Sequence, residues 1–172
     1  MKDDVKVSGV VEIIRVTDRS GAVVPVESVL VDGNAQLGSN LVVDGGRAAI
    51  AHLLGGETTG YRISAVSFGT GDEPPRYNDV TLSPQPGGEY TGGENQVELS
   101  SGAYNKPIAA VLFPAPYLVQ FQFSLDYHEA NGFVIREAGL WTEAGVLFAR
   151  KAFPGIIKSS ENRIEMMWTL RS

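Results

Sequence analysis

Four consecutive strands are predicted between residues 117 and 170, and this pattern limits the possible folds more than any other feature of the chain. At residues 117–125 large apolar side chains occupy every second position, and polar side chains stand between most of them. This two-residue period is typical of a strand with one buried face. Further strand patterns follow at 133–141, 146–153 and 164–170. We expect these four strands to form an antiparallel meander, in which 133–141 runs back beside 117–125.

The composition favours a single mainly β domain. The chain has 172 residues with 20 Gly and 9 Pro, and it shows only one clear helical pattern. A chain of this length can bury enough surface to fold without disulfides. We therefore predict a mainly β protein, an antiparallel β-sandwich with the C-terminal meander and one short helix. Within one compact unit, residues 1–39 are expected to form an N-terminal hairpin or arm, and residues 40–172 the sandwich domain.

The one helix is predicted at residues 48–54, where good helix formers stand between two pairs of glycines. Asp44 precedes this run and is a candidate N-cap. Ile50, Leu53 and Leu54 share one face of such a helix. We expect this face to cover an open end or a face of the sheet.

Charge and cysteine content exclude several classes of function. The net charge is −6 and the pI is about 4.9, without a basic stripe, which argues against nucleic acid and membrane surfaces as partners. The chain has no cysteine, so it has no thiol nucleophile, and this is consistent with folding in a reducing cytoplasm. The charged N-terminus leads directly into a strand pattern, so we expect no secretory or membrane-spanning segment.

No metal site, cofactor site or catalytic motif is predicted. His52 and His128 are the only histidines, and they lack the spacing of metal ligands. Asp72, Glu73 and Asp79 could offer oxygens to calcium, but their spacing matches no EF-hand, and a solvated acidic loop is the favoured interpretation. The glycine turn that precedes them lacks the Lys-Ser/Thr pair of a phosphate-binding loop. Neither histidine adjoins a nucleophile elbow, so we expect a protein that is not an enzyme.

Glu137 is the most unusual charged residue of the predicted meander. It shares a strand face with Ile135 and Trp141, so its carboxylate is expected to lie in apolar surroundings. A buried charge requires a partner, and Arg150 and Lys158 are the nearest candidates along the chain. We predict a structural ion pair that fixes the strand register. A catalytic role for Glu137 is the alternative.

Three loop tyrosines are candidate interface residues. Tyr77, Tyr90 and Tyr104 lie in segments rich in Gly, Pro and Asn, and tyrosine in such positions is enriched at protein contacts and at carbohydrate-stacking sites. Tyr90 stands among four glycines in residues 84–94, which are expected to form an exposed flap.

Several sequence segments together resemble a known class of proteins. They are ISAVSFGTG at 63–71 with DVTL at 79–82, EANG at 129–132, IREAGLW at 135–141, LFARK at 147–151, and Lys158. In this order and spacing they resemble small tail-associated structural proteins of tailed bacteriophages. The resemblance covers roughly residues 40 to 170, and no catalytic residues come with it.

The resemblance implies a virion protein of the tail tip, baseplate, fibre attachment or neck, synthesised in the host cytoplasm. Such a protein would act by oligomeric assembly, as a ring or trimer, with copies of itself and with other tail proteins. The alternative from another class is a carbohydrate-binding module that recognises a bacterial surface glycan. A hydrolase comes third.

Overall fold

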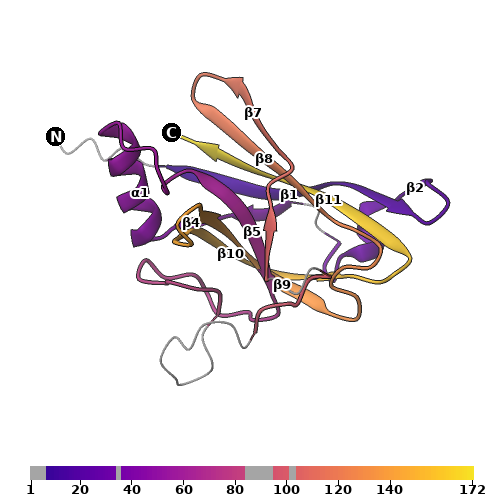
Figure 1. Cartoon of the computed structure of the whole chain (residues 1–172). Helices are drawn as coiled ribbons and strands as arrows, with labels where there is room; N and C mark the ends of the chain where they lie inside the picture. Colours follow the sequence, from indigo (N-terminus) through magenta and orange to yellow (C-terminus); the bar gives the residue numbers. More distant parts are fainter. Residues whose placement is uncertain (1–6, 34–35, 84–94, 101–103) are drawn as a thin grey trace.

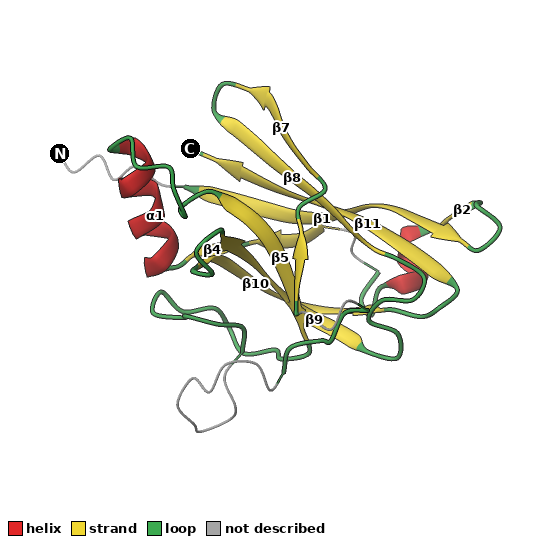
Figure 2. Cartoon of the chain, in the orientation of Figure 1, coloured by secondary structure: helices red, strands yellow, loops and turns green. Residues whose placement is uncertain are grey.

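Two antiparallel sheets pack face to face in the computed structural model, which describes residues 7–33, 36–83, 95–100 and 104–172 (Figures 1 and 2). Sheet A has the order β2-β1-β11-β8-β7, with β3 also paired to β1, and sheet B has the order β4-β10-β9-β5-β6. One α-helix, α1, accompanies the sheets, and a single 3₁₀ turn, η1, is present in the described part of the chain. The predicted mainly β sandwich with one short helix is confirmed.

The strands of sheet A are β1 (Ser8–Asp18), β2 (Val23–Val24), β3 (Gln36–Ser39), β7 (Ala110–Ala115), β8 (Leu118–Leu125) and β11 (Asn162–Arg171). Those of sheet B are β4 (Leu41–Val42), β5 (Ile63–Gly69), β6 (Asn105–Pro107), β9 (Val134–Thr142) and β10 (Leu147–Ile157). The helix α1 spans Asp44–Leu54, and η1 spans Val26–Val29.

The alternating strands supply the core between the sheets. In β11 every second side chain is buried, and Trp168, the largest of them, is fully buried. Phe121 and Phe123 of β8 are buried beside it. Burying a side chain of this size contributes about 1.5–3 kcal/mol relative to leaving it exposed. The two-residue period in the sequence therefore identified the inner face of both strands.

The four C-terminal strands occur in the predicted order, but their pairing differs from the predicted one. β8 pairs with β7 and β11 in sheet A, whereas β9 pairs with β5 and β10 in sheet B. Residues 133–141 therefore do not run back beside 117–125. The chain crosses to sheet B between β8 and β9 and returns between β10 and β11. A period of two residues shows which side chains share a face, and it does not show which strand is the neighbour.

The N-terminal region belongs to sheet A. β1 pairs with β11 over almost its whole length, from Ser8 opposite Arg171 to Asp18 opposite Asn162. The described part of residues 1–39 is thus integrated in the sandwich and does not form a separate arm. The predicted hairpin is shorter than expected, because β2 has two residues and Pro25 leads into η1.

Helix α1 lies across one end of the sandwich (Figure 1). The helix begins at Asp44, and Val43 occupies the N-cap position without a side-chain hydrogen bond. The prediction that Asp44 is the N-cap is therefore wrong. Helix position 46 requires glycine, because a Cβ there would overlap the backbone oxygen of Phe148 in β10. Leu54 is 84% exposed and takes no part in the packed face.

Candidate functional site

The outer face of sheet B carries a buried charged cluster, which we call the Arg150 cluster: Asp79, Ser83, Glu137 and Arg150. Arg150 of β10 stands opposite Gly139 of β9, and cross-strand partners project from the same face of a sheet. Glu137 is two residues before Gly139 and therefore shares this face. The segment at 70–83, after β5, covers the cluster and supplies its other two members.

The Arg150 guanidinium is the centre of the cluster. Its Nε and Nη2 lie 2.9 and 2.8 Å from Oε2 of Glu137, and its Nη1 lies 2.6 Å from Oδ2 of Asp79. Nη2 also donates to Oγ of Ser83 and to the backbone oxygen of Glu73, at 2.9 Å each. Arg150 and Glu137 are 0% exposed and Asp79 is 2% exposed. Hydrogen bonds between charged partners are about twice as strong as neutral ones.

Glu137 is enclosed by backbone as well as by Arg150. The backbone N–H of Ser83 donates to both carboxylate oxygens, at 3.0 and 2.8 Å. Gly69 and Gly71 lie so close that a Cβ at either position would come within 3.0 Å of the Glu137 carboxylate. Glycine in the Phe-Gly-Thr-Gly turn is therefore required by the volume of the carboxylate.

The surroundings of Glu137 support a structural role. Burial raises the pKa of the Glu137 carboxyl, whereas the Arg150 charge and the Ser83 N–H act in the opposite direction. A general acid or base must reach its substrate, and this carboxylate is fully buried with its oxygens engaged by Arg150 and Ser83.

The structure brings Glu137 and Arg150 together, but it places Lys158 elsewhere. Lys158 follows β10 and donates to Oδ1 of Asn131 at 3.1 Å and to the backbone oxygen of Ser159 at 2.7 Å. The prediction that Lys158 could supply the counter-charge of Glu137 is therefore wrong.

The prediction of a solvated acidic loop is also wrong for Asp79, because this residue is buried against Arg150. The sequence contains a signal for this arrangement. Asp79, Thr81 and Ser83 stand at alternate positions, and all three are buried. Polar residues with the period of a strand can line a buried polar face as well as an exposed one.

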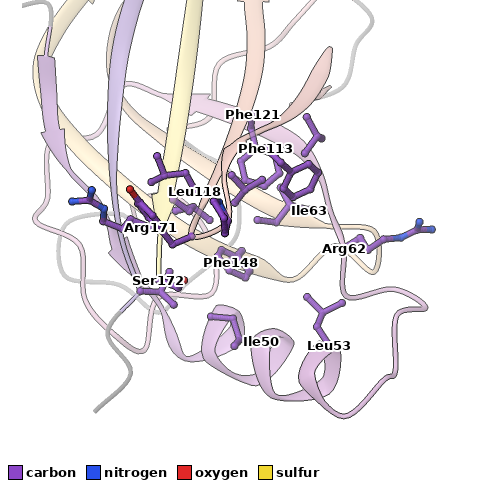
Figure 3. A pocket seen from close by; sticks show the side chains of 16 residues that line it. Ile50, Leu53, Arg62, Ile63, Phe113, Leu118, Phe121, Phe148, Arg171 and Ser172 are labelled. Atoms are coloured by element: carbon purple, nitrogen blue, oxygen red, sulfur yellow. The ribbon is translucent and has the colours of Figure 1, made fainter. Parts of the chain in front are cut away.

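An apolar cavity of about 500 Å³ lies between α1 and the β7–β8 hairpin (Figure 3). Ile50 and Leu53 of α1 line one side, and Phe113, Phe121 and Phe148 line others. Arg62 and Arg171 border it with their guanidinium groups directed away from its centre in Figure 3. Arg62 pairs with Glu143 at 3.1 Å, and Arg171 lies over the ring of Tyr117 at 5.4 Å. The walls are therefore almost entirely apolar.

Strand β7 forms the outer edge of sheet A next to this cavity. It pairs with β8 on one side, and its sequence AVLFPA contains no charged residue. Val111, Leu112 and Phe113 are 43%, 42% and 76% exposed. Edge strands are usually protected by charges or other devices against pairing with another chain. Within the sequence of β7 itself, Pro114 is the one residue that hinders such pairing, because it has no backbone N–H to donate.

Two of the three predicted interface tyrosines are accessible. Tyr77 is 53% exposed, and the Arg47 guanidinium lies 4.7 Å from its ring centroid. Tyr104 is 46% exposed. Tyr90 and the predicted flap at 84–94 lie outside the described residues. Tyr77 and Tyr104 thus remain interface candidates.

The histidines occupy unrelated positions in the fold. His52 stacks on Tyr61, with ring centroids 4.1 Å apart, and its Nδ1 lies 2.7 Å from Oε2 of Glu57. Within the described ranges, no group of three or more His, Asp or Glu side chains is placed to hold a metal ion. The same part of the chain contains no helix with the length and apolar character needed to span a membrane.

Comparison of the chain with protein-family models, with curated proteins and with solved structures found no match. Evidence on function therefore comes from the residues and contacts of this chain.

We expect Glu137→Ala to reduce the free energy of unfolding by about 3–5 kcal/mol, because it removes one of the two carboxylates that pair with the buried Arg150 cation and leaves two of its N–H groups facing a cavity. Glu137→Gln should cost less, since the amide keeps the shape and one acceptor. Denaturant unfolding measures both. Glu143→Ala is the matched control, because its partner Arg62 is exposed and the pair should contribute only about 0–1 kcal/mol. Near-equal stability of Glu137→Ala and the control would contradict a structural role.

Proposed function

We propose that this protein is a non-enzymatic structural component of a bacteriophage tail, in the tail tip, baseplate, fibre attachment or neck, and that it acts by oligomeric assembly. The observation that carries the proposal is the uncharged, apolar edge strand β7 beside the apolar cavity. The resemblance of the sequence motifs to tail-associated proteins supports the same function. Two of these motifs supply the Phe-Gly-Thr-Gly turn and Arg150, which meet around Glu137.

Strand β7 offers both kinds of interaction that join subunits through sheets. An edge strand can hydrogen-bond to a strand of another chain, while its side chains bury apolar surface on either face. Leaving Val111, Leu112 and Phe113 in water forfeits about 25 cal/mol for each Å² of apolar area that a partner could cover. Val111 and Phe113 line the cavity, whereas Leu112 alternates to the opposite face of the strand, so a partner strand added at this edge would bring side chains against both faces.

Charge favours β7 as the contact between copies of the chain. Each copy carries a net charge of −6, so two copies repel one another over most orientations. The uncharged β7 edge lets two backbones approach without placing like charges together. Contacts between copies of one chain that close by rotational symmetry produce dimers or rings. A tail protein would add contacts with other tail components.

The carbohydrate-binding alternative has weaker support. Sugar rings stack on exposed aromatic faces, but a guanidinium group already lies over one face of Tyr77 and of Tyr117. Tyr104 is the exposed loop tyrosine without such a ring contact among the described interactions, and a single ring offers little area for a glycan. Binding of a bacterial surface glycan by the isolated protein would favour this alternative.

In purified particles of the phage that encodes this chain, we expect the protein at a fixed copy number, because an architectural subunit is assembled stoichiometrically. Quantitative mass spectrometry against the major tail protein measures the ratio. Absence from particles, or a ratio that varies between preparations, would contradict the proposed function.

At the β7 edge we expect Phe113→Glu to shift the purified protein from oligomer to monomer, since it places like charges at the contact between copies. Phe113 is 76% exposed, so the fold should tolerate the change. Light scattering over a range of concentrations measures the molar mass.

The control for that experiment is Val80→Glu, which adds the same charge at a 65% exposed position outside β7 and should leave assembly unchanged. Assembly of Phe113→Glu at wild-type concentrations would argue against β7 as the contact between copies.

A further inference from the structure

Lys158 is a buried primary amine that the proposed function does not use. It is 1% exposed, and it follows the last residue of β10. Its backbone N–H donates to the oxygen of Phe133, and its own backbone oxygen accepts from the N–H of Gly132. These two hydrogen bonds hold Lys158 directly beside the turn that joins β8 to β9.

The side chain of Asn131 in that turn is held from two directions. Its Nδ2 donates to the backbone oxygen of Tyr127 at 2.8 Å, and its Oδ1 accepts from Nζ of Lys158 at 3.1 Å. The carboxamide carbon Cγ is one bond away from that oxygen. An amine and a carbonyl carbon are thus kept at close range in a fixed orientation, which is the main requirement for a reaction between two groups of one molecule.

The charge state of the amine suits a nucleophile. Burial lowers the pKa of Lys158 to about 8, although Glu129 and Asp126 act to raise it, and Lys106 and Arg19 lower it further. About half of the molecules would then carry a neutral amine at pH 8, and only the neutral form has a lone pair that can attack.

We propose that Lys158 and Asn131 form an intramolecular isopeptide bond. Nζ of the neutral Lys158 attacks Cγ of Asn131, and a C–N bond forms. The bond between Cγ and Nδ2 then breaks, a proton passes from Nζ to Nδ2, and one molecule of ammonia leaves. No oxidant, reductant or co-reactant is consumed. Asn131 is exposed at the turn, so ammonia can escape and water can carry the proton.

The bond would enclose β9 and β10 in a covalent ring, since both strands lie between residues 131 and 158. These strands carry Glu137 and Arg150, so the ring would hold together the part of sheet B that contains the buried charges. Closing a loop covalently removes conformational freedom from the unfolded chain, as a disulfide does. A chain without cysteine can obtain this stabilisation in a reducing cytoplasm only through another kind of bond.

Mass spectrometry of the denatured, full-length wild-type chain tests the proposal. We expect a mass lower than the sequence mass by one ammonia, and a tryptic digest in which the peptides containing Asn131 and Lys158 are covalently joined. Lys158→Met and Asn131→Ala should each show their full sequence mass. Asn78→Ala, which changes an exposed loop asparagine, is the matched control and should retain the deficit.

Two results would overturn the proposal. One is the full sequence mass for the folded wild type after prolonged incubation at pH 9, where the amine is mostly neutral. The other is a deficit of one ammonia with Asn131 and Lys158 in separate, linear peptides, because the Asn131-Gly132 pair can also lose ammonia by closing a succinimide on its own backbone. Since these measurements are made on the mass of the chain, their outcome is independent of the tail function.

Discussion

The fold of sheet B depends on a single buried guanidinium. Arg150 joins Glu137 of the neighbouring strand to Asp79 and Ser83 of the segment that covers the sheet. Removing such charges from water costs several kcal/mol for each ion, and only good geometry with additional hydrogen bonds offsets this cost. Here Arg150 makes five contacts with three side chains and one backbone oxygen, and the Ser83 N–H completes the coordination of the carboxylate.

This arrangement also determines which surfaces remain free. With residues 70–83 fixed over its outer face, sheet B is covered on both faces around β9 and β10, and a second small core of Val43, Trp141 and Leu147 forms there. Among the described residues, no equivalent segment covers sheet A at β7, and the helix leaves an apolar cavity beside that strand. One sheet is thus closed by charge and hydrogen bonding, and the other presents an apolar edge that suits assembly.

Some of this could be predicted from the sequence, and the reasons for the rest are physical. The two-residue period identified the buried faces of β8 and β11, and the position of Glu137 predicted a buried carboxylate with Arg150 as a candidate partner. Strand neighbours depend on contacts far apart in the chain, so the pairing of β8 with β11 was not predictable from local pattern. The same limit applies to Asp79, whose partner lies in a distant strand. It also applies to β7, whose apolar run is compatible with a central or an edge strand.

Hydrogen exchange at the Ser83 backbone amide tests the account of the Arg150 cluster most directly. Ser83 lies outside the strands, but its N–H donates to the buried Glu137 carboxylate. If the cluster fixes this segment, residue-resolved exchange measured by NMR should show the Ser83 amide protected to the same degree as the amides of β9 and β10. All of these amides should then exchange only through global unfolding. Exchange at the rate of an exposed loop amide, while β9 and β10 remain protected, would contradict the account.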